Sequence, residues 1–231
     1  MTVAGTAAMM LWYDIVPEVV AEHDEWHTRE HFPERVGIPG FLRAQRWVAQ
    51  GTTSPRYFVT YEVRDVAVLT SPAYRERLDH PSEWTRRMMP HFRGMVRGFC
   101  ALDTCIGSAL GAEVLTVRCA PEQGERERLT SWLRNEALPG IARTRGAASA
   151  FLLVAAADPP MTVEQSLRGR DAKVDTVLVV TGYEARFIEA VRAGPLAAAA
   201  LHAHGASDET VHGCYRLACR ADAAAAFASQ R

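Results

Sequence analysis

Three histidines at four-residue spacing form the pattern in this sequence that most directly suggests chemistry. His23, His27 and His31 would lie in one stripe along a helix. Imidazoles one turn apart can bind Zn, Ni or Cu, but three consecutive turns cannot converge on one ion, and the sequence has no HExxH pattern. A metal site is not predicted, and a divalent metal stays open as an alternative. The other interpretation is a partly solvated face with His31 alone turned inward.

Proton transfer is the chemistry that these residue types favour. His31 is the first candidate for a catalytic base or acid, because an imidazole titrating near neutral pH can take up a proton and return it elsewhere. His80 would supply a second catalytic proton-transfer group. Arg86 and Arg87, close to it in the chain, could bind a carboxylate or enolate, because a guanidinium matches planar anions. The alternative is a helix capped by Ser82 with solvated arginines.

Two similar segments follow one another in the chain, which suggests a tandem duplication. Residues 25–33 resemble residues 131–139 at an offset of 106, and the offset becomes 122 to 123 after an insertion and 115 near the end. We predict a first repeat at 1–106, a linker at 107–111, and a second repeat at 112–231 with an insertion at 158–173. The matched pairs include Trp26 and Trp132, Glu30 and Glu136, Pro33 and Pro139, Gly40 and Gly146, and Tyr61 and Tyr183.

Each repeat has the expected element order β-α-β-β-α-β, the ferredoxin-like arrangement of an α+β fold. A helix of about four turns should end at Pro33 and at Pro139, and a second helix should break at Ser71-Pro72 and at Gly194-Pro195. Strands are predicted from apolar or alternating segments at 9–15, 41–49, 56–63, 95–102, 113–117, 147–156, 176–183 and 210–218.

Two such repeats can solve a packing problem for each other. A four-stranded sheet with helices on one face leaves its other face bare, and two sheets packed face to face cover both. We therefore predict a dimeric α+β barrel formed within one chain. The repeats differ in residues that could do chemistry: His31 lies opposite Ala137, and the second repeat is about eight residues shorter around His80 to His91. The first repeat is the candidate active copy, and the second is the more structural one.

Aromatic side chains of the first repeat would form the walls of a small-molecule pocket. Trp26 could instead be a packing residue, since Trp132 matches it, and Tyr61 could pack across the barrel. Trp12 and Tyr13 face opposite sides of a strand, so at most one of them lines the pocket. The predicted substrate-binding residues are Trp12, Trp26, His27, Tyr57, Tyr61, Trp84, Arg86, Arg87 and His91.

The first repeat also resembles a known family. The likeness is carried by Trp26 to Pro33, Pro39-Gly40-Phe41, Arg43 to Trp47, Tyr57 to Glu62 and Ser71 to Tyr74. These segments look like the EthD-like and related branches of the dimeric α+β barrel superfamily, more closely over 9–104 than over 112–220. The resemblance implies the fold, and a pocket between the sheet and helices of one repeat that is often lined by a histidine at the position of His31. It implies function only loosely, because such proteins include isomerases, decarboxylases, dehydratases, monooxygenases and haem enzymes.

Several classes of protein are disfavoured by composition and motifs. The 26 basic and 27 acidic residues give a net charge of -1, which provides no field for nucleic acid or an anionic membrane. No apolar stretch is long enough to span a bilayer, and we expect a cytoplasmic protein. Rossmann, Walker and GxSxG patterns are absent. The five cysteines form no CxxC pair and are expected to be buried free thiols.

The leading functional hypothesis is a cofactor-independent acid–base enzyme, such as an isomerase, dehydratase, cyclase or decarboxylase, for a small hydrophobic metabolite of aromatic or polyketide-like character. One alternative is a monooxygenase or a haem-binding enzyme in which His31 is an axial ligand. Another is a non-catalytic binding or assembly module. No cofactor is predicted, haem stays open, and the partners expected are a small-molecule substrate and further copies of the chain.

Overall fold

The computed structural model describes residues 5–156, 162–168 and 171–223 and has the α+β architecture that the sequence predicts. The first half contains β1 (Ala7–Ile15), α1 (Val20–Trp26), α2 (Phe32–Val36), β2 (Phe41–Ala49), β3 (Tyr57–Val63), α3 (Pro72–Asp79), α4 (Glu83–Met88) and β4 (Phe92–Ile106). The second half contains β5 (Glu113–Cys119), α5 (Arg126–Trp132), α6 (Leu138–Ala142), β6 (Ala147–Ala155), α7 (Val163–Arg168), β7 (Ala172–Lys173), β8 (Thr176–Gly182), α8 (Ala185–Ala193), α9 (Ala198–Ala203) and β9 (Val211–Asp222).

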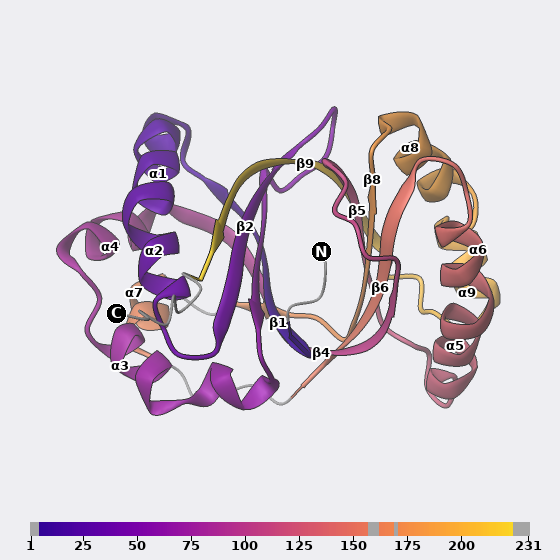
Figure 1. The fold of residues 1–231 in the computed structure, drawn as a ribbon, viewed down its shortest axis with the longest axis horizontal. Coiled ribbons are helices and arrows are strands. Elements are labelled where there is room, and N and C mark those ends of the chain that lie inside the picture. The colour runs from indigo at the N-terminus through magenta and orange to yellow at the C-terminus, as the bar shows by residue number, and fades with distance from the viewer. Residues whose placement is uncertain (1–4, 157–161, 169–170, 224–231) are drawn as a thin grey trace, which may run out of the picture.

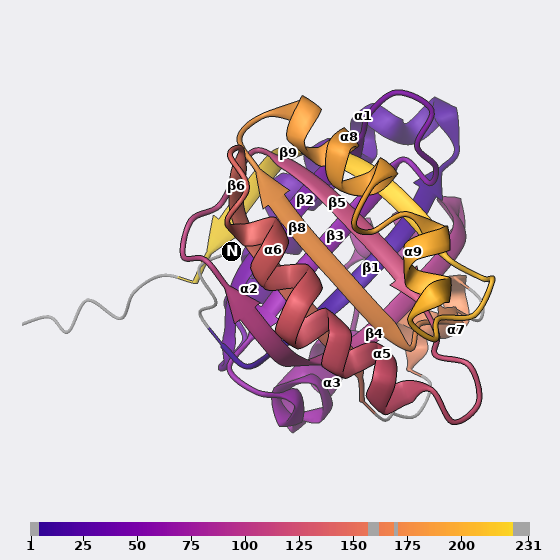
Figure 2. The same ribbon diagram turned by 90° about the vertical axis from the view of Figure 1, so that its right-hand side faces the viewer.

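Eight strands close into an antiparallel barrel. Their order is β1-β3-β2-β9-β5-β8-β6-β4, and β4 pairs back onto β1. The two longest strands join the halves, because β4 pairs first with β1 and then with β6, and β9 pairs first with β5 and then with β2. Figure 1 shows the helices on the two flanks of the barrel, and Figure 2 shows α5, α6, α8 and α9 of the second half in front of the sheet that contains β5, β8 and β6.

Alternation along the strands divides the buried side chains among three cores. Met10, Trp12 and Phe58 point into the barrel, whereas Leu11 and Tyr13 point toward the helices of the first half. The prediction that Trp12 and Tyr13 face opposite sides is therefore confirmed. A third core lies between the sheet and helices of the second half.

The first helix of each half contains a widened π turn at the same position. The π turns span His27–His31 and Leu133–Ala137, which are 106 residues apart. The prediction that these helices end at Pro33 and Pro139 was wrong, because both continue as α2 and α6. Each proline lies in the first turn after the π turn, where a missing N–H is tolerated. The predicted breaks before Pro72 and Pro195 are confirmed.

All eight predicted strands are present, and the largest error is at the last strand of each half. Strand β4 runs over Phe92–Ile106 and β9 over Val211–Asp222, longer than the predicted 95–102 and 210–218. The extra residues at the C-terminal ends, 104–106 of β4 and 219–222 of β9, pair with the sheet of the other half, a contact that the local sequence pattern does not encode, whereas Phe92 and Arg93 pair with β1 of their own half. Of the insertion at 158–173, residues 162–168 and 171–173 form α7, β7 and their flanks, and the rest lies outside the described residues.

Strand registers give a position-by-position correspondence between the halves. The first residue of β2 pairs with Val63, and the first residue of β6 pairs with Gly182, so Val63 and Gly182 correspond. Two residues earlier, Tyr61 corresponds to Val180. The match of Tyr61 with Tyr183 made from the sequence was therefore wrong, since Tyr183 follows β8 and is 60% exposed.

Two smaller expectations can be compared with the structure. All five cysteines lie in the described ranges and are free, but Cys105 is exposed and Cys219 is half-buried, so only three are buried as expected. No helix within the described residues is long and apolar enough to cross a membrane.

The barrel interior predicts a large loss of stability when a side chain is removed from it. Phe58 is fully buried there, and Phe58→Ala should lower the free energy of unfolding by about 3–5 kcal/mol because a cavity remains. Urea unfolding would measure it. The control Val211→Ala, at a site 43% exposed, should change stability by less than about 0.5 kcal/mol. Similar small changes in both variants would contradict a tightly packed barrel interior.

Candidate active site

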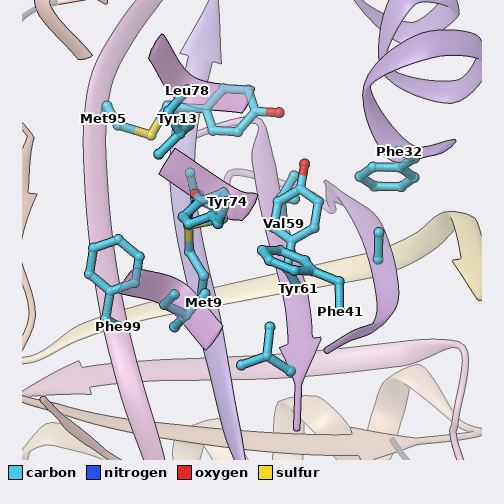
Figure 3. Close-up of a cluster of buried hydrophobic side chains, with 14 of the residues drawn as sticks. Met9, Tyr13, Phe32, Phe41, Val59, Tyr61, Tyr74, Leu78, Met95 and Phe99 are labelled. Carbon is cyan, nitrogen blue, oxygen red and sulfur yellow. Dashed lines mark hydrogen bonds between the residues drawn. The ribbon is translucent and has the colours of Figure 1, made fainter. Parts of the chain in front are cut away.

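A small cavity lies between the sheet and the helices of the first half. Its volume of about 30 Å³ is enough for about two water molecules at ~10–15 Å³ each. The lining is mainly apolar with several polar groups, and Figure 3 shows part of it, with Tyr13 and Tyr61 rising from neighbouring strands. The lining residues are Met9, Leu11, Tyr13, Trp26, His27, His31, Arg35, Val59, Tyr61, Tyr74, Leu78, Met89, Phe92, Met95, Arg97, Glu164 and Gln165.

Three stacked imidazoles are buried beside this cavity. His23, His27 and His31 are 0%, 2% and 6% exposed. Ring centroids are 5.1 Å apart between His23 and His27 and 5.4 Å apart between His27 and His31, and Trp26 lies 4.4 Å from His31. The interpretation of a partly solvated face with His31 alone turned inward was wrong. The whole stripe faces the sheet, so all three imidazoles are removed from water.

His27 and Tyr61 form a buried pair in the cavity wall. His27 Nε2 and Tyr61 Oη are 3.2 Å apart, and Nδ1 of His27 is buried without a hydrogen-bond partner among the described residues. Burial, together with the neighbouring His23 and His31, lowers the pKa of His27 well below 6.5. Burial also raises the pKa of Tyr61 well above 10. Both side chains are therefore neutral at pH 7.

A second hydrogen-bonded chain connects the cavity wall to solvent. Tyr13 Oη lies 3.1 Å from His23 Nε2, and His23 Nδ1 lies 3.1 Å from Asp24 Oδ1. The Asp24 side chain is 36% exposed and also accepts a 2.8 Å hydrogen bond from Tyr57. Although burial opposes it, the His23 hydrogen bond and the charge of Arg46 hold the pKa of Asp24 below its usual range. Tyr13, His23 and Asp24 thus form a continuous hydrogen-bonded chain from the cavity wall to a partly exposed carboxylate.

Two arginines that line the cavity are each paired with an acid from the insertion of the second half. Arg35 Nη2 donates to Glu164 Oε2 at 2.5 Å, and Arg97 Nε lies 3.0 Å from Asp171 Oδ2, with all four side chains buried. In Figure 1 helix α7 lies on the flank with α2, α3 and α4, away from the other helices of its own half. The second half therefore supplies part of the wall of the first-half cavity.

The second half has apolar residues at the positions that carry these polar groups. This correspondence follows from the strand registers and from the π turns at a constant offset. Because the second half folds with an aliphatic filling, the polar groups of the first half are not needed to form the scaffold. The corresponding residues are Cys119 for Tyr13, Leu129 for His23, Leu133 for His27, Ala137 for His31, Ile141 for Arg35 and Val180 for Tyr61.

The structure brings together four of the residues predicted from the sequence and separates the others from the cavity. His31, His27, Trp26 and Tyr61 line it, and Tyr61 faces the helices rather than packing across the barrel as one interpretation had it. Residues that do not line it are Trp12 (inside the barrel), Tyr57 (buried beside Asp24), Trp84 and His91 (half-buried), and His80, Arg86 and Arg87 (exposed). The exposed His80 instead hydrogen-bonds within its own helix, to the Glu76 carbonyl.

Sequence reasoning missed several residues of the site. Arg35 continues the stripe of His23, His27 and His31 at the same four-residue spacing, which would have been a usable signal. Tyr13 follows from alternation once Trp12 is placed inside the barrel. Glu164 gave no signal, because its contact with Arg35 joins residues 129 positions apart.

The arrangement of strands and helices is that of the dimeric α+β barrel proteins. One solved structure with this fold is an anthrone oxidase-like protein, 12% identical with a TM-score of 0.67 over 99% of this chain and 98% of that chain. Others are a protein provisionally named as a monooxygenase from Fusobacterium nucleatum (6%, 0.59, 95% of each chain) and a haem-binding protein from Thermus thermophilus (8%, 0.51, 93% and 92%). At these identities the likeness shows the fold alone. No protein-family model and no curated protein matches the sequence.

Haem does not fit this cavity as it stands. Its volume of about 30 Å³ is far below the roughly 300–1,000 Å³ of small-molecule sites, so any aromatic ligand also requires side chains of the wall to move aside. Both nitrogens of His23 and Nε2 of His27 are also within hydrogen-bond distance of protein groups. Within the described ranges, no group of three or more His, Cys, Asp or Glu side chains is placed to hold a metal ion.

The lowered pKa values of His23 and His27 predict a loss of stability in mild acid. Below about pH 6.5 the unfolded chain binds protons at these imidazoles before the folded protein does, so stability falls as the pH falls through this range. The loss is up to about 1.4 kcal/mol per pH unit for each histidine. In urea unfolding between pH 7.5 and 5.5, His27→Gln should show a shallower fall than the wild type.

The matched control is the exposed His80. His80→Gln leaves the buried imidazoles in place and should keep the wild-type slope of stability against pH. An unchanged slope in His27→Gln would contradict burial of a neutral His27.

Proposed function

We propose that the protein is an enzyme that removes a proton from an aromatic C–H or O–H acid bound in the first-half cavity, with His27 and His31 as the proton-transfer groups and no cofactor. The observation that carries the proposal is the set of six polar positions that the second half fills with apolar residues. The scaffold forms without such groups in the second half, yet in the first half all six lie in or beside the wall of one cavity. Buried polar groups that stability does not require are typical of functional sites.

The proton acceptor is the neutral His27. In the tautomer with its proton on Nε2, His27 donates a hydrogen bond to Tyr61 Oη, and the lone pair on the buried Nδ1 can accept a proton. The Tyr61 hydroxyl hydrogen is then available to an oxygen of the substrate that gains negative charge. His31 lines the same wall, stacked on Trp26.

Proton exchange with solvent runs through the second hydrogen-bonded chain. Tyr13 lines the cavity, and His23 connects it to the partly exposed Asp24. A proton that passes from the substrate to Tyr13 can be relayed along this route to Asp24 and water. The buried site is thereby linked to the bulk pH.

A second candidate function is cofactor-independent oxygenation, which is favoured by the anthrone oxidase-like protein and the provisionally named monooxygenase that share the fold. It begins with the same proton removal. The carbanion then gives electrons to dioxygen, and the balanced reaction is R₂CH₂ + O₂ → R₂C=O + H₂O, in which two C–H bonds break and one oxygen atom leaves as water. Dioxygen is the oxidant, and the protein needs no redox group of its own.

An anthrone that carries a ring carboxylate is a suitable probe, because two arginines line the cavity and the methylene protons of this probe are acidic. In deuterated buffer without oxygen, the protein should catalyse their exchange, and His27→Gln and Tyr61→Phe should each slow it about 10²-fold. Nuclear magnetic resonance of the methylene signal measures the rate. His202→Gln, a half-exposed position of the second half, is the control and should exchange at the wild-type rate.

Oxygen separates the two candidate functions. If oxygenation is the reaction, admitting air should produce the quinone with one dioxygen consumed for each anthrone. The proposal fails if exchange persists at the wild-type rate in the double variant His27→Gln, His31→Ala.

A further inference from the structure

Arg35 places a positive charge in the wall of a mainly apolar cavity. The side chain is 2% exposed, and its guanidinium lies 5.8 Å from the centre of the Tyr74 ring. Ile141 occupies the corresponding position in the second half, so the scaffold does not require a cation here. Burial of a guanidinium is costly unless anionic partners surround it. The partners of Arg35 therefore indicate what this position is arranged to bind.

Two carboxylates partner Arg35, and they come from different places. Glu34 is its neighbour in the chain and lies 3.3 Å from Nη1, with a side chain that is 17% exposed. Glu164 comes from α7 of the other half, is buried, and accepts a 2.5 Å hydrogen bond from Nη2. Glu164 and Gln165 both line the cavity. An acidic side chain from the insertion therefore fills the space in front of the guanidinium.

The pairing of Arg97 with Asp171 repeats this arrangement on the neighbouring wall. Arg97 lies 3.0 Å from Asp171, which also belongs to the insertion. The carboxylates of Glu164 and Asp171 thus neutralise the two arginines that line the cavity. Ion pairs, and not apolar packing alone, therefore close the cavity.

We infer that the Glu164 carboxylate occupies the position of a ligand carboxylate, and that the cavity takes an aromatic carboxylate which displaces Glu164 from Arg35. The inference rests on the proposed function in one respect, namely that this cavity is the substrate site. Departure of Glu164 and Gln165 would add their space to the cavity. The ring of the ligand would lie among Trp26, His31 and the apolar side chains.

Charge selectivity follows from this arrangement. A neutral ring that displaced Glu164 would leave the buried guanidinium of Arg35 without this ion pair, which is strongly unfavourable. A ligand that brings its own carboxylate restores the ion pair, and the guanidinium fork matches a carboxylate in geometry. The Arg35–Glu164 pair therefore selects for anionic ligands and excludes neutral ones.

Calorimetric titration of the whole chain with benzoate and with benzamide, which differ in charge but little in shape, tests the inference. Glu164→Gln removes the internal competitor and should bind benzoate at least tenfold more tightly than the wild type, with benzamide changed less than twofold. Arg35→Gln should lose benzoate binding. Glu34→Gln is the matched control, because it removes the other acid beside Arg35 and leaves Glu164 in place, and it should tighten benzoate binding several-fold less than Glu164→Gln does.

Several outcomes would overturn the inference. Equal tightening for benzoate and benzamide in Glu164→Gln would mean that the substitution only loosened α7. Equal tightening in Glu34→Gln and Glu164→Gln would mean a general change of charge around Arg35. If Glu164→Gln does not fold, Glu164→Asp keeps the charge but shortens its reach, and an affinity for benzoate unchanged from the wild type would overturn the inference instead.

The binding result is independent of turnover. Charge-selective binding without any exchange of anthrone protons would refute the proposed chemistry and leave this inference standing. Catalysed exchange together with equal affinity for benzoate and benzamide in every variant would refute this inference alone.

Discussion

The pairing of β4 and β9 with both halves is the constraint on which the rest of the structure depends. Each strand begins in the sheet of its own half and ends in the sheet of the other, so the barrel has no seam at which the halves could separate. A closed barrel leaves the helices only its outer surface. The spaces between sheet and helices are then the places where one half can carry a site without disturbing the other.

The same pairing explains how an insertion in the second half reaches a cavity in the first. Strand β6 ends beside Cys100 of β4, so the chain that follows it leaves the barrel next to the first half. Strand β7 then pairs with β4 at Val96 and Arg97, on a stretch that β6 does not cover. This pairing fixes Asp171 and α7 over the cavity. The second half is therefore a structural partner that also supplies side chains to the site.

The two halves share one scaffold but differ in the side chains that lie between the sheet and the helices. In the second half, Leu129, Leu133 and Ile141 pack as an ordinary aliphatic layer. In the first, imidazoles and a guanidinium take these places, and each such group loses its hydration when buried. Hydrogen bonds with Tyr13 and Tyr61 and the ion pair with Glu164 offset part of that loss. The barrel interior and the apolar residues of both halves supply the packing of the fold, which does not depend on these polar groups.

Much of this organisation could be predicted from the sequence, since periodicity and self-similarity are local signals. They predicted the element order and eight strands, and the family resemblance implied a pocket beside His31. Positions such as Glu164 could not be predicted, because its partner is distant in the chain and the contact depends on how the barrel closes. His80 was singled out by its residue type and by the shorter second repeat in this region, and the structure places it on the surface.

The π turn in the first helix sets the rotational phase of the site. In a regular α-helix each residue advances about 100°, so residues four apart drift by about 40° and a series of four would wind around the axis. The π turn holds one additional residue, and this rotates the helix that follows it back toward the direction of the preceding turns. His23, His27, His31 and Arg35 consequently stay aligned toward the sheet over four turns. Because the second half has the same turn with no polar stripe to align, this helix geometry does not depend on the polar groups, and the four side chains share a direction that the scaffold itself provides.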